Sequence, residues 1–343
     1  MGVCENASSS ARRSTLNAMR AGFPVALVLA AASACSIAGL DDYASGGDAG
    51  NDAGLDAPKD VTSLPDQVAP DSSSTDSGSD VVIPPACNLA APFGAATPLA
   101  SLNSSVIDGS ALLSPDELTI LFTSNRLGAG LNVFTAARAN KSAAFGAAAP
   151  LASLNFGGAD TWNVALTGDG LTAYFVTDQN AADHMYVATR ASSLAGFGTP
   201  KLMPVPIVSG EQPFVTPDGK ALYYTDQLTG PKYQIARAAL GATPTVAAVP
   251  ISVPSMDVGI PVLNPTETLM YFTVFDHTNF LSYDIWTAKR ATANDAWSAP
   301  TAVAELNTSG FEGPSWISPD GCALYFTRAL SGSNWDMYVA RKP

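Results

Sequence analysis

Five acidic residues stand at a recurring place in the 343-residue chain, each directly before a predicted β-strand. They are Asp108, Asp160, Glu211, Asp257 and Glu312. If those strands surround one axis, the five carboxylates gather at one mouth of a central channel. Carboxylates crowded in this way repel one another, which raises the pKa values of some of them unless a cation or hydrogen-bond donors compensate. A structural role, cation binding and catalysis all have to be considered.

The three roles make different demands on the acids. In a structural role, each carboxylate accepts hydrogen bonds from backbone N–H groups of its own loop. A Ca²⁺ ion would suit the ring because it takes about six to eight oxygen ligands. Sugar hydrolysis needs two carboxylates in distinct settings, one of them with a raised pKa. Because these acids occupy copies of one repeat, the structural role is favoured first, a cation second and catalysis last.

The strands that would position the acids belong to a sequence repeat. Residues 316–341 read WISPDGCALYFTRALSGSNWDMYVAR, and four earlier stretches resemble them. The third turn residue of each copy falls at 116, 169, 218, 266 and 320, so the period is 48 to 54 residues. In S-P-D-G, Pro presets φ, Asp can bond its own backbone and Gly closes a tight turn between antiparallel strands. Short strands repeated at about this period are typical of β-propeller blades.

An extra strand suggests how the repeats close. The sequence FGAAAPLASLN at residues 145–155 supplies a fourth strand after the first copy, and FGAATPLASLN at residues 93–103 precedes any copy. The last copy ends after its third strand. We therefore expect the N-terminal strand to complete the last blade, which removes two exposed sheet edges. The predicted fold is an all-β, five-bladed β-propeller closed in this way.

The motifs also resemble a known family. S-P-D-G followed by LYFT and DMYVAR is similar to the TolB-like propeller repeat, a relative of the WD40 repeat, over about residues 93–343. Copies two and four depart from the motif, with TGDG from Thr167 and NPTE from Asn264. The resemblance implies a β-propeller of a bacterial cell envelope, of a kind that mostly binds proteins or glycans and includes a minority of enzymes.

Two of the four cysteines lie in the repeat region. Cys87 precedes the N-terminal strand, at a place that aligns with the end of a third strand, and Cys322 begins the second strand of the last copy. These two positions are neighbours in a four-stranded blade, and an exported protein sits where disulfides persist. The sequence is consistent with a Cys87–Cys322 disulfide that staples the closure, or with two free cysteines.

The N-terminus carries an export signal. Residues 19–36 read MRAGFPVALVLAAASACS, with a positive flank and an apolar run too short to span a bilayer, which needs roughly twenty residues. Small residues before Cys35 resemble a lipobox, which predicts acylation of Cys35. Plain secretion after cleavage and an uncleaved segment are the alternatives. Translation from Met19 in place of Met1 would give a more typical signal peptide.

A spacer follows the signal peptide of residues 1–35. Residues 36–86 contain ten Asp and one Lys among Ala, Gly, Ser and Pro. Such a segment cannot bury enough surface to fold, so we expect a disordered acidic tether before a propeller at residues 87–343. A docking strip for a cationic partner or Ca²⁺ is the alternative interpretation.

Composition narrows the functional classes. The net charge of −13 argues against nucleic-acid binding, which needs clustered Lys and Arg. The two histidines, His184 and His277, have no zinc-ligand spacing, and no P-loop or dinucleotide motif occurs. We expect a monomeric outer-membrane or periplasmic lipoprotein, or else a secreted protein. Its membrane contact would be the lipid anchor.

The expected activity is binding without catalysis, with a protein or glycan partner of the cell envelope at the channel mouth. A carbohydrate-active hydrolase or lyase that uses the mouth carboxylates is the alternative. Aromatic residues near the acids could stack on sugar rings, although strand aromatics more often belong to the core. They are Trp162, Phe214, Phe311 and Trp316.

Overall fold

The structure is a computed structural model that describes residues 87–343 except 129, 181, 206, 228–231, 242, 277–278 and 331–333. The predicted signal peptide with Cys35 and the predicted tether of residues 36–86 lie outside the described residues. Apart from two short 3₁₀ helices, η1 (Ala152–Leu154) and η2 (Ile207–Ser209), the regular elements are β-strands. None of the helices in the described part is long and apolar enough to cross a membrane.

Three separate sheets contain four antiparallel strands each. The first has β2 (Asp108–Leu113), β3 (Thr119–Ser124), β4 (Asn132–Ala137) and β5 (Ala149–Pro150). The second has β6 (Thr161–Leu166), β7 (Thr172–Thr177), β8 (His184–Thr189) and β9 (Lys201–Leu202). The third has β10 (Glu211–Val215), β11 (Ala221–Asp226), β12 (Gln234–Ala239) and β13 (Thr245–Ala248).

The remaining eight strands form one sheet made of two antiparallel arrays. One array has β14 (Asp257–Leu263), β15 (Leu269–Asp276), β16 (Asn279–Lys289) and β17 (Thr301–Ala302). The other has β18 (Phe311–Ile317), β19 (Ala323–Ala329), β20 (Asp336–Arg341) and β1 (Thr97–Pro98). A single parallel bridge between Tyr283 and Phe311 joins the two arrays.

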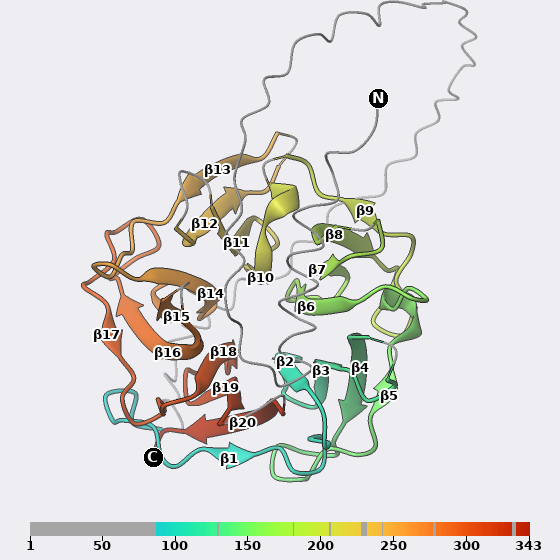
Figure 1. Ribbon diagram of the computed structural model, residues 1–343, viewed down its shortest axis with the longest axis horizontal. Coiled ribbons are helices and arrows are strands. Elements are labelled where there is room, and N and C mark those ends of the chain that lie inside the picture. Colours follow the sequence, from blue (N-terminus) through green and yellow to red (C-terminus); the bar gives the residue numbers. More distant parts are fainter. Residues whose placement is uncertain are drawn as a thin grey trace, which may run out of the picture. The chain divides into compact units, whose positions relative to one another are not determined.

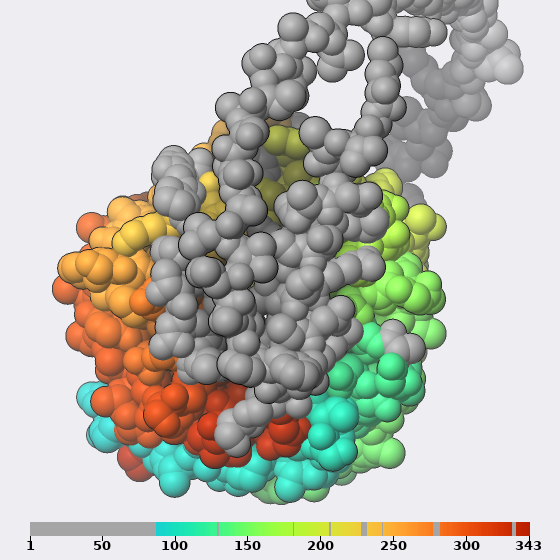
Figure 2. Space-filling model, viewed as in Figure 1, coloured from blue at the N-terminus to red at the C-terminus, as the bar shows by residue number. Residues whose placement is uncertain are grey.

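The first described strand pairs with the last. In β1, Thr97 lies opposite Val339 and Pro98 lies opposite Tyr338 of β20, in antiparallel register. The segment predicted to complete the last array therefore lies beside β20, and Figure 2 shows the first described residues (blue-green) against the last ones (red). Cys87 and Cys322 form a disulfide across 235 residues, with 5.8 Å between their Cα atoms. It is the pair that the repeat alignment singled out.

The strands that follow the five acids contact one another in sequence. β2 contacts β6, β6 contacts β10, β10 contacts β14, β14 contacts β18, and β18 contacts β2 (Figure 1). Ser110 Oγ of β2 donates to Asn163 Oδ1 of β6 at 2.6 Å, and Ser110 N donates to Thr327 Oγ1 of β19 at 3.0 Å. Each inner strand therefore lies next to the following one, and the last lies next to the first.

The core lies between neighbouring sheets. Phe122 and Phe134 of the first sheet share a buried cluster with Tyr325 and Met337 of the last array. The second strands of the sheets are buried on both faces, which explains why their sequences are continuously apolar and aromatic. Packing of this kind fixes the inner strands and hence the backbone positions of the acids.

The acids of the S-P-D-G turns serve the turns. Hydrogen bonds from Ser114 Oγ and from Leu118 N hold the pKa of Asp116 below its usual value, and Asp169 and Asp218 are bonded in the same way. In the divergent fourth copy, Asn264 Oδ1 accepts from the backbone N–H groups of Thr268 and Leu269. These turns lie at the end of the inner strands opposite the five acids.

Candidate functional site

Asp108 is held by an arginine that the sequence did not indicate. The carboxylate is fully buried and accepts from Ser104 N and Ser104 Oγ, both at 2.6 Å. Arg126 Nη2 lies 2.5 Å from Asp108 Oδ1 and also donates to Leu102 O. The acid at the start of β2 is therefore neutralised within its own sheet.

Glu312 repeats this arrangement in the last array. Thr308 donates from N at 3.0 Å and from Oγ1 at 2.6 Å, and Arg328 Nε lies 2.9 Å from Glu312 Oε1. Arg328 also donates to Leu306 O, and Glu312 is fully buried. Arg126 lies two residues after β3, and Arg328 lies near the end of β19; they stand 18 and 16 residues after their acids, a spacing that the sequence could have revealed.

The other three acids have different settings. Asp160, directly before β6, accepts from Leu131 N of the preceding sheet at 2.8 Å. Glu211 begins β10 and is half-buried, whereas Asp257 begins β14 with 1% exposure. All three take part in further interactions within the molecule. The structure therefore offers five individual environments at one end of the inner strands.

The acids differ in register as well. Every inner strand contains a one-residue β-bulge. In each sheet, residues of the second strand can be counted from the pair just after the bulge to the residue opposite the acid. The count is three for Asp108 and Glu312, two for Glu211 and four for Asp257. Since alternate residues of a strand point to opposite faces, the first pair and the second pair face opposite sides of their sheets. The expectation that the acids are equivalent copies is wrong at this level.

Five aromatic rings form a continuous row at the same end of the inner strands. Ring centroids are separated by 5.8 Å for Tyr233–Phe275, 4.3 Å for Phe275–Tyr283, 4.9 Å for Tyr283–Phe311 and 4.5 Å for Phe311–Trp335. We call these residues the aromatic arc. Phe275 is buried and the other four are half-buried, so each of those four presents part of its surface to solvent.

The aromatic arc and the acids share backbone neighbours. Asp257 pairs with Phe275, Glu312 follows Phe311 in β18, and Asp108 N donates to Trp335 O at 2.8 Å. We use the name channel mouth for the aromatic arc together with the five acids. Of the aromatics proposed from sequence, Phe311 belongs to the aromatic arc, and Trp162 lies at the same end, in β6 opposite Val176 and two residues after Asp160. Phe214 and Trp316 make edge contacts with Tyr223 and Tyr325 towards the opposite end.

Two acids that the sequence did not single out join the channel mouth. Burial, and then the negative charge of Glu312, raises the pKa of Asp284. Burial, and then the charge of Asp108, raises the pKa of Asp336. Asp336 Oδ1 is buried with no hydrogen-bond partner among the described residues. The channel mouth therefore holds carboxylates that would be stabilised by an added positive charge.

The tyrosine at the centre of the aromatic arc connects further acids. Burial raises the pKa of Tyr283, and Tyr233, Glu211 and Asp257 raise it further through their charges. The structure thus brings Glu211 and Asp257 near the same phenol. For metal binding, no group of three or more His, Cys, Asp and Glu side chains is suitably placed in the described ranges.

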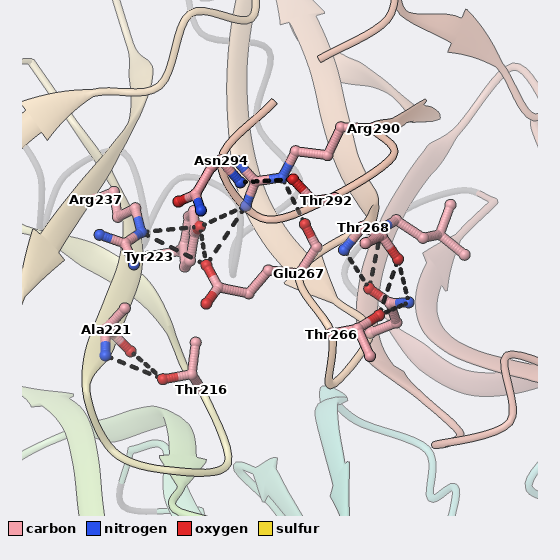
Figure 3. A network of polar contacts seen from close by, with 12 residues as sticks. Thr216, Ala221, Tyr223, Arg237, Thr266, Glu267, Thr268, Arg290, Thr292 and Asn294 are labelled. Atoms are coloured by element: carbon pink, nitrogen blue, oxygen red, sulfur yellow. Dashed lines mark hydrogen bonds and ion pairs between the residues drawn. The ribbon is translucent and has the colours of Figure 1, made fainter. Parts of the chain in front are cut away.

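A second polar cluster lies at the opposite end of the inner strands, between the third sheet and β16 (Figure 3). Tyr223 Oη donates to the Glu267 carboxylate, and Arg237 Nε donates to Tyr223 Oη at 3.0 Å. Arg290 Nε donates to Glu267 O at 2.6 Å, and its Nη2 lies 3.5 Å from Glu267 Oε2. No sequence motif indicates this cluster, although Arg237 is the one charged residue of β12, which reads QIARAA.

Comparisons with known proteins give similarity only at the level of structure. No family model matches the sequence. No curated protein matches it. The structure is similar to TolB from Acinetobacter baumannii, with 17% identity and a TM-score of 0.46, over 68% of this chain and 54% of that one. The chain therefore spans about half the length of that TolB chain.

Two further solved structures are similar. A putative TolB from Agrobacterium tumefaciens has 15% identity and a TM-score of 0.46, over 68% of this chain and 74% of that one. A chain of a nidogen/laminin complex has 13% identity and a TM-score of 0.40, over 65% of this chain and 73% of that one.

Proposed function

We propose that residues 87–343 form a five-bladed β-propeller closed by β1 and that it acts as a non-catalytic binding scaffold outside the cytoplasm. The antiparallel pairing of β1 with β20 and the sequential contacts of the five inner strands support the closed ring. The Cys87–Cys322 disulfide supports folding in an oxidising compartment, since disulfides are rare in the cytosol. Acylation of Cys35 would tether the propeller to a membrane, in the outer membrane or facing the periplasm.

The channel mouth is the proposed binding surface, and its partner is a protein that presents Lys or Arg side chains. One observation carries this choice: the half-buried rings of Tyr283 and Trp335 directly precede Asp284 and Asp336, two carboxyl groups whose pKa values are raised by burial and by the charge of another acid. A cation over an aromatic face gains about 0.5–2 kcal/mol, and more where water is excluded. A basic side chain would also relieve the repulsion between Asp284 and Glu312.

A glycan partner is the alternative at the same surface, because aromatic rings also stack on sugars. Hydrolysis is less well supported. Asp108 and Glu312 are each committed to an arginine, and a general acid or nucleophile paired in this way would have to lose a buried ion pair during the reaction. The scaffold therefore remains the proposal.

The test uses a pentalysine peptide and chitopentaose as probes in isothermal titration calorimetry. We expect the peptide to bind in a salt-sensitive manner, and the double variant Asp284→Asn/Asp336→Asn to weaken it at least tenfold. Asp169→Asn/Asp218→Asn is the matched control, because it also removes two charges, at the opposite end of the inner strands, and keeps an acceptor for each turn. Peptide binding that survives the double variant contradicts the proposal. Binding of chitopentaose alone, lost in Phe311→Ala, would support the glycan alternative.

A further inference from the structure

A cavity of about 220 Å³ opens beside the second polar cluster, at the end of the inner strands opposite the channel mouth. One wall is β13 with the residues that follow it, and the other is the segment after β16. Val246, Val249, Pro250 and Trp297 are among its apolar lining residues. Tyr223, Arg237, Arg290 and Asp295 supply polar groups. The cavity thus combines apolar side chains with two guanidinium groups and one carboxylate.

Arg237 is not part of the repeat pattern. It lies opposite Tyr223 in the pairing of β11 with β12. The residues at this rung in the other sheets are Thr135, Val187, Thr287 and Val339. A charged residue at this place is therefore not needed to build a sheet of this kind.

Glu267 itself is not unique to this sheet. It has φ 55°, and Glu117 at the equivalent turn position of the first copy has φ 61°, whereas glycine stands at positions 170, 219 and 321. What the first copy lacks is an arginine at the Arg237 rung, where it has Thr135. Burial, and then the hydrogen bond to Glu267, raises the pKa of Tyr223, so the phenol stays a donor to that carboxylate.

Arg290, unlike Arg237, has equivalent arginines in other sheets that make the same contacts. Its guanidinium stacks on Trp297 at 4.2 Å and bonds a turn carbonyl, as Arg138 and Arg190 do with Phe145 and Phe197. Its side chain is 8% exposed, whereas that of Arg237 is 40% exposed. Arg290 is therefore a buried part of the cavity lining, whereas the side chain of Arg237 is accessible to a ligand.

The guanidinium of Arg237 has unused donors. Its Nε makes the contacts to Tyr223 and Glu267, while neither Nη atom has a hydrogen-bond or ion-pair partner in the part of the chain that the structure describes. Figure 3 shows these nitrogens turned away from Glu267. Glu267 and Asp295 together balance the formal charge of the two arginines. Asp295 accepts from Thr292 N and Oγ1, both at 2.8 Å, so it is engaged in its own turn and the Nη donors of Arg237 remain available.

We propose that this cavity is a binding site for a small organic carboxylate with an apolar body. The carboxylate would accept from the free edge of Arg237, since a guanidinium fork matches the two oxygens of a carboxylate. The apolar body would lie against Val246, Val249 and Trp297. A dry cavity of about 150 Å³ binds benzene in another protein, so this volume can hold one ring and a carboxylate.

The experiment measures binding of sodium benzoate and sodium butyrate to the full chain by ligand-observed NMR at constant ionic strength. Benzyl alcohol serves as the neutral probe of similar shape. We expect saturable binding of the carboxylates at millimolar concentration, with at least tenfold weaker binding of benzyl alcohol. Arg237→Gln should weaken benzoate binding at least tenfold. Arg237→Lys should lose most of it as well, because an ammonium group is a point charge without the fork.

Two further variants separate binding from folding. Lys220→Gln removes the same charge from an exposed side chain near the cluster and should bind benzoate like the wild type. Asp295→Asn removes a negative charge from the rim and should tighten binding two- to fivefold. Wild-type protein that shows no saturable binding of either carboxylate overturns the proposal. So does benzoate binding that is unchanged in Arg237→Gln. Because the site lies away from the channel mouth, either result leaves the proposed scaffold function untouched.

Discussion

Removal of the Cys87–Cys322 disulfide gives the sharpest test of the closure. The double variant Cys87→Ala/Cys322→Ala avoids a free thiol and keeps the pairing of β1 with β20. Loop-entropy arguments assign about 5 kcal/mol to a crosslink across 235 residues, because the crosslink restricts the unfolded chain. For a domain of this size each kcal/mol shifts Tm by about 2 °C, so we expect Tm to fall by about 10 °C.

Two readouts are needed because the ring can also open locally. Urea unfolding followed by tryptophan fluorescence measures the global free energy, and limited proteolysis of residues 87–103 reports whether β1 detaches first. Reductant should lower the wild-type Tm to that of the double variant and leave the variant unchanged. A Tm shift below about 2 °C would refute the reasoning, since the long crosslink would then contribute almost nothing to closure.

Three other perturbations follow from individual contacts. Arg126→Gln leaves the fully buried Asp108 without its cation, so we expect a loss of about 3–5 kcal/mol in urea unfolding, whereas Arg341→Gln at an exposed position should cost far less. Asp336→Asn removes a carboxyl whose folded-state pKa is raised, so its ionisation destabilises the native state as pH rises through that pKa. The variant should therefore melt above the wild type at pH 7, and the difference should vanish as pH falls below 3.8; a constant difference would contradict this cause. Cys35→Ala should abolish metabolic labelling by a fatty-acid analogue, and label that persists would exclude acylation of Cys35.

The sequence allowed the long-range pairing to be predicted because the repeat carries it. Residues 93–103 copy a fourth strand, so their place beside β20 follows from alignment alone, and the positions of Cys87 and Cys322 follow from the same alignment. The packing of neighbouring sheets against each other could also be predicted, because the second strands are apolar on both faces. These features depend on residue type and repeat period, and both can be read directly from the sequence.

The side-chain environments at the channel mouth were less predictable. The acids differ in register because the number of residues between the acid and the bulge differs from strand to strand, and a difference of one residue reverses the face of the side chain. Arg126 reaches its acid from the turn after β3, and Arg328 reaches its acid from β19. The rings of the aromatic arc come from strands and loops that are far apart in the sequence, so no local sequence pattern predicts it.

A repeat structure offers its own control for assigning function. Residues that most copies share are explained by the fold, as the turn acids Asp116 and Asp218 are explained by the hydrogen bonds that close their turns. A residue that one copy alone carries needs another explanation. Arg237 meets this criterion because four equivalent rungs are Thr or Val, and it is the accessible charge of a cavity. The same comparison weakens any role for the five acids as interchangeable ligands: they share a residue type, while their partners and registers differ, so each has to be tested singly.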